Sequence, residues 1–568
     1  MAKNKPVYAF EEADSKKRML LGGKGAGLSE MTRLKLPVPP GFTITTEICN
    51  KYYDNNGKLP KDVMPAVMKN IAKMEKKTGK KWNSTKNPLL VSVRSGAAIS
   101  MPGMMDTILN LGLNEKTVEG FAEQTKNPRF SWDSYRRFIQ LFGKVVFGVN
   151  DEKFDHVLDD AKEKQGVTDD SKLSVESLKS IVSKYKKICE EHTKRKFPDT
   201  PNEQLVLSIE AVFKSWMGER AIVYREKNNI TKDIANGTAV NVVTMVFGNM
   251  GDDSATGVVF TRNGHNGKKE IEGEYLINAQ GEDVVAGVRT GKSIELLKKD
   301  MPKSHKELSN ACAKLEKHFR EPQDIEFTIE QGKFYLLQTR TAKMSAAALV
   351  KTSVDMVKEK LIDKNRALIR IPAQQLEALL HRTMDGTKIK NYKQLAKGIG
   401  ASPGAASGIV VFDVKKAIEL GDNGKKVILV RKDTKPEDVP AFFSSEGILT
   451  SQGGKSSHAA IVSRGMGKPC IVGCPELKID YDNNVGTANG MTIKEGETIT
   501  IDGSEGTVFI GEIPTVEPKV TKDFEQILAW AQKTKTLGIR ANADTPDMAK
   551  LARKFGGQGI GLCRTERM

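Results

Sequence analysis

The chain has 568 residues, enough for several domains. Hydrophobic residues make up 39% and aromatic residues only 6%, which argues against the stacked aromatic platforms that bind nucleic acids. The formal net charge is +18, but the lysines are scattered and often stand beside Glu or Asp, so we interpret the excess as a solvated basic surface. A nucleotide substrate adds a modest reason for it, and we expect no nucleic-acid partner.

The cysteine pattern and the hydropathy limit the cellular compartments in which we expect the protein. The six cysteines contain no CxxC pair, and neither a secretory leader nor an apolar stretch long enough to span a bilayer is recognisable. We therefore expect reduced thiols, no membrane partner and a cytoplasmic location. Import into an organelle, directed by a C-terminus beyond this sequence, stays open.

The first candidate site is the glycine-rich stretch Leu20–Met31, which contains Lys24. It predicts a turn that leads into an amphipathic helix, followed by a loop and a strand over 36–46. Glycines let backbone amides approach a phosphate, and a lysine neutralises it. The spacing is not that of a Walker A motif, and an ordinary turn is the alternative.

A second stretch, Pro88–Asn114, predicts a buried strand that delivers Arg94 to its end, then a Gly/Met loop and another strand. A solvent-exposed arginine is the alternative. Residues from about 115 to 230 show apolar residues at three-to-four spacing, which predicts helices. Among them lies Arg137, which is either a phosphate contact or a surface arginine.

Strands return over 239–262, where a Gly/Asp-rich turn predicts a hairpin. A further strand over 274–279 precedes Glu282 and Asp283. Ribose hydroxyl groups are hydrogen-bond donors, so two carboxylates suit them as acceptors.

The stretch 322–340 predicts a hairpin that turns at Gln331-Gly332. Residues two apart on a strand share a face, so the polar side chains of both strands gather together. Carboxylate and amide oxygens suit Mg²⁺ shared with a triphosphate, and an arginine can grip the phosphates. The alternative is a cross-strand ion pair between Glu326 and Arg340. The candidate metal ligands are Asp324, Glu326 and Gln338, with Arg340 as the phosphate contact.

Residues 345–397 alternate helix-forming and polar runs, which favours a swivel over a core. The β-rich stretch 398–512 contains a buried strand that runs into the Gly-Gly turn of Thr450–Cys470. His458 is predicted in the first turn of a short helix, near unpaired amides and the positive end of the helix dipole. These conditions stabilise a phosphate carried on the ring. The alternative is a surface histidine beside a serine cap.

Several long motifs resemble the pyruvate, phosphate dikinase family. They are Ser92–Ala97, Met101–Asn114, Arg129–Gln140, the set Asp324, Glu326, Gln338 and Arg340, and Gly453–Pro469. The resemblance implies that His458 carries phosphate covalently, that Lys24, Arg94, Arg137 and Arg340 serve the ATP phosphates, and that 239–262 forms an adenine-binding wall of an ATP-grasp fold. It also implies that Glu282 and Asp283 contact the ribose.

The match extends to the end of the chain and to Ser456. Residues 539–544 and 559–568 resemble the first two strands of a (β/α)₈ barrel that binds phosphoenolpyruvate or pyruvate, with Arg564 as a substrate contact. A whole barrel needs about 250 residues, so we expect a truncated chain. Ser456 keeps a hydroxyl where plant members of the family carry a regulatory phosphothreonine, so it is a phosphate contact or a regulatory position.

The expected fold is therefore a multidomain α/β protein. Its predicted parts are an ATP-grasp domain over 1–344 with a helical subdomain at about 115–230, a linker over 345–397, a swivelling β/β/α phosphohistidine domain over 398–512, a linker over 513–534 and the start of a barrel over 535–568.

The resemblance implies conversion of ATP, phosphate and pyruvate to AMP, diphosphate and phosphoenolpyruvate through pyrophospho- and phosphohistidine. It also implies Mg²⁺ as cofactor and a homodimer for the full-length protein. We expect this chain to keep only the ATP and phosphate steps. The alternatives are a phosphoenolpyruvate synthase-like enzyme with water as acceptor, and a non-catalytic nucleotide-binding fragment.

Overall fold

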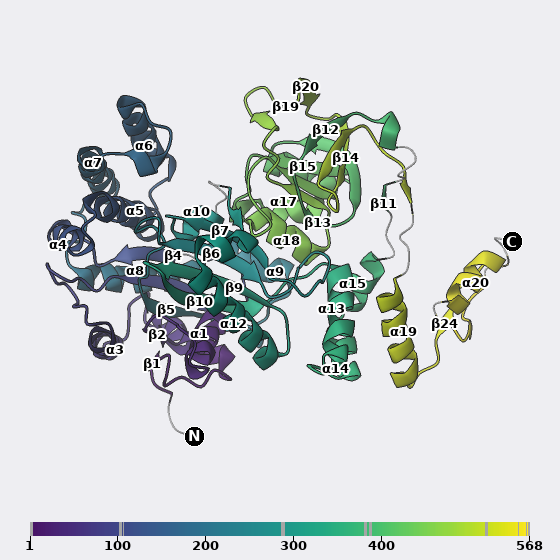
Figure 1. The fold of residues 1–568 in the computed structure, drawn as a ribbon, viewed down its shortest axis with the longest axis horizontal. Coiled ribbons are helices and arrows are strands. Elements are labelled where there is room, and N and C mark those ends of the chain that lie inside the picture. The colour runs from purple at the N-terminus through teal and green to yellow at the C-terminus, as the bar shows by residue number, and fades with distance from the viewer. Residues whose placement is uncertain are drawn as a thin grey trace.

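The computed structural model describes residues 4–101, 105, 107–285, 290–379, 383–384, 389–516, 521–554, 556–563 and 565. They form a mixed α/β protein of several parts (Figure 1). No helix within the described ranges is both long and apolar enough to cross a membrane.

The first sheet has five strands in the order β1-β2-β5-β3-β4. They are Val7–Ala9, Gly41–Ile44, Thr238–Thr244, Val91–Ala97 and Thr107–Leu111. Helix α1 (Arg18–Arg33) packs on β3 and breaks at Gly22, where φ is 69°. A Cβ atom at Gly22 would lie 1.8 Å from the carbonyl oxygen of Gly96, so only glycine lets the two segments approach this closely. Helices α2 (Thr46–Asp54) and α3 (Val63–Thr78) complete this region.

The predicted helices between 115 and 230 are confirmed. Their starts follow capping rules, since the Asn114 side chain accepts from the amides of Lys116 and Thr117, and Pro128 and Pro201 stand in the first turn of their helices. Their apolar faces share one core with the first sheet. The helices are α4 (Glu115–Thr125), α5 (Pro128–Phe147), α6 (Glu152–Gln165), α7 (Val175–Thr193), α8 (Pro201–Ser215) and α9 (Glu219–Lys227), with the 3₁₀ turn Asp170–Lys172.

The second sheet has the order β10-β9-β6-β7-β8. The hairpin of β9 and β10 is confirmed, with Gln331 and Gly332 at φ 48° and 71°, the left-handed region that a tight hairpin turn requires. The strands are β6 (Ala255–Phe260), β7 (Glu272–Ile277), β8 (Lys292–Ser293), β9 (Gln323–Glu330) and β10 (Lys333–Thr341). The helical segments are α10 (Gly281–Val285), the 3₁₀ turn Ile294–Leu296, α11 (Leu297–Asp300) and α12 (Pro302–Phe319).

The hairpin predicted over 239–262 is wrong. Strand β5 pairs with β2 and β3 in the first sheet, whereas β6 pairs with β7 and β9 in the second. The glycines and aspartates between them do reverse the chain locally, but each of the two strands pairs with strands that are distant in the sequence. The connection therefore crosses from one sheet to the other.

The fully buried Arg262 ties the second sheet to two helices. Its guanidinium lies 2.7 Å from the Glu316 carboxylate in α12 and 2.8 Å from that of Glu359, the C-cap residue of α13 (Ala346–Lys358). An arginine satisfies two carboxylates at once because its donors form a rigid fork. Removing it leaves the buried carboxylate of Glu316 without a cationic partner, although the Thr261 hydroxyl still donates to it at 2.8 Å.

We expect Arg262→Met to lower the free energy of unfolding by about 3 kcal/mol, the cost typical of breaking a buried ion pair on one side. Urea titration followed by circular dichroism measures it. The matched control is Arg195→Met at an exposed position, which should stay within about 0.5 kcal/mol of the parent. Equal stability of the two variants would show that the buried pair contributes nothing.

Residues 345–397 hold more apolar packing than the swivel interpretation implies. Helix α13 (Ala346–Lys358) packs against α14 (Lys364–Ile369), and both pack against α19 (Lys522–Thr534) from the other predicted linker. Val354, Ile527 and Trp530 belong to their shared buried cluster, and Figure 1 shows α13 and α19 side by side. Helix α15 (Ala373–Ala378), strand pair β11 (Thr383–Met384) with β23 (Thr515–Val516) and the 3₁₀ turn Ile389–Asn391 complete these connections.

The central part is an eight-stranded sheet in the order β12-β22-β21-β14-β15-β16-β17-β13, with a three-stranded sheet β18-β19-β20 beside it. Continuous apolar runs such as Val427–Val430 form its buried parallel strands. The strands are β12 (Gln394–Lys397), β13 (Ile399–Ser402), β14 (Ala405–Val411), β15 (Val427–Arg431), β16 (Gly447–Thr450), β17 (Cys470–Val472), β18 (Lys478–Asp480), β19 (Val485–Ala488), β20 (Met491–Lys494), β21 (Thr498–Asp502) and β22 (Thr507–Ile510). The helices are α16 (Val414–Asp422), α17 (Val439–Ser444) after the 3₁₀ turn Pro436–Asp438, and α18 (His458–Met466).

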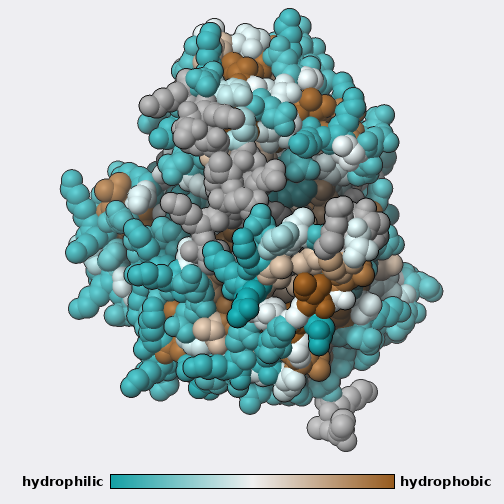
Figure 2. Space-filling view, turned by 90° about the vertical axis from the view of Figure 1, so that its right-hand side faces the viewer, coloured by the Kyte–Doolittle hydropathy of each residue, from teal (hydrophilic) through white to brown (hydrophobic). Residues whose placement is uncertain are grey.

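The last segment is a small β-α-β unit. Strands β24 (Arg540–Ala541) and β25 (Gly559–Ile560) pair in parallel, joined by α20 (Pro546–Lys554). Several of its apolar side chains are exposed, including Leu551 and Ile560. Figure 2 views the molecule from the side on which this segment lies and shows apolar side chains among mostly hydrophilic ones. Arg564 lies outside the described residues.

Candidate active site

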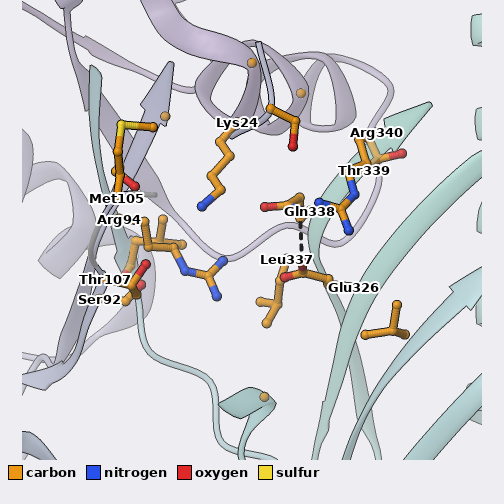
Figure 3. Close-up of a pocket in the computed structure, with 18 of the residues that line it drawn as sticks. Lys24, Ser92, Arg94, Met105, Thr107, Glu326, Leu337, Gln338, Thr339 and Arg340 are labelled. Carbon is orange, nitrogen blue, oxygen red and sulfur yellow. Dashed lines mark hydrogen bonds between the residues drawn. The ribbon is translucent and has the colours of Figure 1, made fainter. Parts of the chain in front are cut away.

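A cavity of about 1650 Å³ lies between the two N-terminal sheets and reaches the central part. It brings together most of the side chains that the sequence singled out, some of them more than 400 positions apart. Figure 3 shows Lys24, Arg94, Glu326, Gln338 and Arg340 around it. The predicted site residues that line it are Lys24, Arg94, Glu282, Glu326, Gln338, Arg340, Ser456 and His458.

Lys24 supplies a half-buried positive charge at the wall of the cavity. It follows the break at Gly22 in α1, and its side chain points into the cavity (Figure 3). Burial, together with the positive charges of Arg94 and Arg340 and against the opposing charge of Glu326, lowers the pKa of Lys24 to about 8. The charged form of this lysine is disfavoured by burial and by an excess of positive over negative charges around it, and a bound anion would reverse that balance. The cavity is therefore electrostatically prepared for a polyanionic ligand.

Arg94 lies within β3 and not at its end. The strand continues to Ala97 and pairs Arg94 with Thr107 on one side and Asn241 on the other. The Ser-Gly-Ala run looks like the start of a loop, but its small residues serve close packing. A Cβ atom at Gly96 would lie 2.8 Å from Asn241 Nδ2 and 3.3 Å from the Cβ atom of Lys24, so glycine lets β5 and α1 pack closely against this strand.

The polar face of β9 and β10 has the predicted register, with Gln338 opposite Glu326 and Arg340 opposite Asp324. Gln338 Nε2 donates to Glu326 Oε1 at 2.9 Å, and Arg340 Nε donates to Asp324 Oδ2 at 2.6 Å. The expected alternative pair, Glu326 with Arg340, is thus replaced by Asp324 with Arg340, because directly opposite residues meet first.

Oxygen atoms suited to a hard cation are present on this face. Asp324 Oδ1 is buried without a hydrogen-bond partner, and burial raises the pKa of Asp324. Glu326 and Gln338 line the cavity, whereas Asp324 lies behind it. Nowhere in the described part of the chain do three His, Cys, Asp or Glu side chains gather to hold a metal by themselves. The donor set therefore fits a cation that also takes oxygens from a ligand.

The two neighbouring carboxylates, Glu282 and Asp283, lie in different surroundings. Glu282 lines the cavity, and burial raises its pKa to about 7. Asp283 instead accepts from Arg137 Nη1 at 2.8 Å and from the amide of Gln280 at 2.9 Å. Arg137 also donates to Asp133 at 3.1 Å. Neither Arg137 nor Asp283 lines the cavity, so Arg137 as a phosphate contact and Asp283 as a ribose contact stay predictions.

His458 begins α18, and Ser457 stands at the N-cap position without a side-chain cap. The hydroxyl groups of Ser456 and Ser457 and the imidazole Nε2 are buried and have no hydrogen-bond partner. Thr434 Oγ1 lies 3.3 Å from Nδ1. Burial lowers the pKa of His458 to about 4, so the ring is neutral at pH 7. The alternative of an ordinary surface histidine does not hold.

Sequence reasoning missed a polar loop beside His458. Thr434, Lys435 and Glu437 follow the end of β15 and line the cavity. The signal was a dense polar run directly after a buried strand, at the same sheet edge as the Gly-Gly turn. Contacts to the N-terminal part hold this edge: Arg220 lies 2.9 Å from Glu437, and Lys455 lies 2.6 Å from Glu272.

Three family models match the chain. They are "Pyruvate phosphate dikinase, AMP/ATP-binding domain" over 18–58, 55–306 and 302–361, "PEP-utilising enzyme, mobile domain" over 423–506, and "PEP-utilising enzyme, PEP-binding domain" over 518–568. The first model alone matches more than half of the chain.

Similar curated proteins share one name. The chain is 53% identical to pyruvate, phosphate dikinase of Entamoeba histolytica and 50% identical to that of Clostridium symbiosum, with 99% of the chain and 64% of each relative covered. It is 46% identical to the chloroplastic pyruvate, phosphate dikinase 1 of Arabidopsis thaliana, covering 59% of that protein. The chain thus spans less than two thirds of the length of these relatives. From the family models and these identities, the chain belongs to the pyruvate, phosphate dikinase family.

Proposed function

We propose that the chain transfers phosphoryl groups from ATP to His458, as the ATP and phosphate half of the pyruvate, phosphate dikinase reaction. The observation that carries the proposal is one shared cavity: a neutral histidine with an unpartnered Nε2 lines the same space as a half-buried lysine and two arginines. The cavity therefore brings the nucleophile, from the central part, to the positive charges of the N-terminal part, which lie far from it in the sequence.

The adenine, ribose and triphosphate of the nucleotide would each contact a different part of the cavity wall. Met245, Val246 and Leu337 offer apolar surface for adenine. Glu282 would accept from the ribose hydroxyls, with Asp283 behind it. The triphosphate would meet Lys24, Arg94 and Arg340, and Arg137 would support this wall through Asp283.

Mg²⁺ would be held by Glu326 and Gln338, with Asp324 behind them, and would neutralise charge on the triphosphate when bound. Gln338 would present its carbonyl oxygen, because its amide nitrogen now donates to Glu326.

The chemistry would proceed in two displacements. The Nε2 lone pair of His458 attacks the β-phosphorus, the bond to the oxygen that bridges to AMP breaks, and AMP leaves with that electron pair. The hydroxyls of Ser456 and Ser457 and the first amides of α18 can donate to the transferred oxygens. Inorganic phosphate then attacks the terminal phosphorus, which gives diphosphate and phosphohistidine.

The finer fold assignment belongs to the same proposal. Residues 1–344 would form an ATP-grasp domain with its helical subdomain at about 115–230, and 398–512 a swivelling phosphohistidine domain. The parts would be joined by linkers over 345–397 and 513–534. Residues 535–568 would begin a (β/α)₈ barrel in which Arg564 binds phosphoenolpyruvate or pyruvate. The β-α-β unit of β24, α20 and β25 supports this last assignment. Assembly as a homodimer and a cytoplasmic location are part of the proposal as well.

Isotope transfer tests the proposed function. The chain is incubated with Mg²⁺ and ATP labelled at the β-phosphate, with and without inorganic phosphate, and protein-bound label and AMP are measured. We expect acid-labile label on the chain, and diphosphate release only when phosphate is present. ATP binding without label would leave a nucleotide-binding chain, and turnover without phosphate would identify water as the acceptor.

The two perturbed groups in the cavity predict a maximum in ATP affinity between pH 7 and pH 8. Ribose donors favour the ionised Glu282, so binding lowers its pKa from about 7 and affinity falls as the pH drops below 7. Phosphate raises the pKa of Lys24 from about 8, so affinity falls as the pH rises above 8. Titration calorimetry across pH 5.5 to about 9.5 measures both limbs. Glu282→Gln should remove the acid limb alone, and an unchanged acid limb would contradict its assignment.

A further inference from the structure

Two loops meet at the edge of the central sheet from which His458 emerges. Strands β15 and β16 are parallel neighbours, with Arg431 opposite Thr450, so their C-terminal ends lie at the same edge. The Ser451 amide donates to the Arg431 carbonyl at 3.0 Å, and the Gln452 amide donates to the Lys432 carbonyl at 2.8 Å. The loop that carries Thr434 is thus fastened by backbone hydrogen bonds to the loop that leads to His458.

The imidazole of His458 has two different nitrogen environments. Nδ1 lies 3.3 Å from Thr434 Oγ1, whereas Nε2 is buried and without a hydrogen-bond partner. The ring of Phe442 meets the imidazole edge to face, with centroids 6.2 Å apart, and so supplies no polar partner. Among the described residues, the Thr434 hydroxyl is the one polar side-chain group recorded at hydrogen-bond distance from the ring.

The position of the single ring proton follows from this asymmetry. Were Thr434 the donor, the proton would sit on Nε2 as a buried N–H without an acceptor, and orphaned N–H groups are rarer in native proteins than under-satisfied acceptors. With the proton on Nδ1, the threonine oxygen accepts it and Nε2 keeps only a lone pair. The charged groups that act on the ring are Glu437 and Lys343, and Glu437 is paired with Arg220.

We propose that Thr434 is a positioning residue that holds His458 in the Nδ1–H tautomer and thereby makes Nε2 the nucleophile. This inference rests on the proposed function. As Nε2 forms its bond to phosphorus and AMP departs with the electrons of the broken P–O bond, positive charge develops on the ring. The Nδ1 proton stays in place, and the lone pair of Thr434 Oγ1 stabilises it. No proton has to leave the attacking nitrogen.

Two measurements on the full 568-residue chain test the role of Thr434. Histidine-selective ¹⁵N labelling reports which ring nitrogen carries the proton at pH 7.5, and the His458 signals are assigned by their loss in His458→Asn. The rate of label uptake from β-labelled ATP is measured in parallel. Thr434→Val removes the hydroxyl at nearly constant shape, Thr434→Ser restores it, and Thr492→Val makes the same change at an exposed site of the small sheet.

We expect a protonated Nδ1 in the parent chain, a mixture of tautomers in Thr434→Val and a labelling rate about tenfold lower with unchanged KM for ATP. Thr434→Ser should recover the parent tautomer and rate, and Thr492→Val should match the parent in both. A parent ring protonated on Nε2, or a valine variant with the parent tautomer and rate, overturns the proposal. If the parent takes no label but its tautomer depends on Thr434, the proposed function fails while the tautomer assignment stands.

Discussion

Replacing His458 with asparagine is expected to abolish covalent labelling from β-labelled ATP, a loss on the order of 10⁴-fold or more. The amide of asparagine occupies polar space but offers no lone pair that attacks phosphorus. The charges that would bind the triphosphate, Lys24, Arg94 and Arg340, come from other elements and stay in place. ATP affinity should therefore remain within about threefold of the parent, because the ring is neutral before reaction.

The His458 experiment needs both a binding and a labelling measurement. Calorimetry gives the affinity, and protein-bound radioactivity gives the transfer. His192→Asn changes an exposed histidine near the end of α7 and should leave both unaltered. Label uptake at the parent rate in His458→Asn would move the phosphate carrier to another residue, and joint loss of affinity and label would indicate a damaged cavity.

Replacing the half-buried Lys24 should have the second largest effect. We expect Lys24→Met to weaken ATP binding by about 100-fold, since a charge-assisted contact to phosphate is lost in a poorly hydrated space. The basic limb of the pH profile should vanish with it. Unfolding stability without nucleotide should not fall, because burial and the neighbouring Arg94 already make the charged lysine unfavourable in the free protein.

A matched control separates this site effect from the net charge. Lys51→Met removes one exposed positive charge from α2 and should leave ATP affinity and the basic limb as in the parent. Calorimetry at pH 7 and about pH 9.5 is sufficient. A basic limb that persists in Lys24→Met would assign the titration to another group.

Local patterns determine much of this fold, and the sequence predicts those parts. The Gln331-Gly332 turn fixes the register that puts Glu326 opposite Gln338, because left-handed residues allow few hairpin geometries. The helices between 115 and 230 follow from apolar spacing and capping residues. The end of Arg94's strand was misjudged, because Gly96 serves packing against Lys24 and not a turn.

Contacts between distant segments could not be predicted from local pattern. The partners of β5 and β6 are chosen by whole sheets, not by the turn between them. From the sequence, Arg137 is expected to be available to a phosphate, but its guanidinium donates to Asp283, which is 146 positions away. Thr434 lies beside His458 only because β15 and β16 pair in the sheet. These side chains depend on tertiary pairing, for which no short-range signal exists.

The shared cluster of α13 and α19 also has a mechanical consequence. The chain runs from α13 through α14, α15 and β11 to the central sheet and returns through β23 to α19, and β11 pairs with β23, so the outgoing and returning segments are joined. A unit tied by two paired connections resists twisting more than a unit tied by one, so the swivel proposed for the central part would have to bend both connections together. If the central part swivels as proposed, weakening the pairing of β11 with β23 would free that movement without altering either side of the cavity.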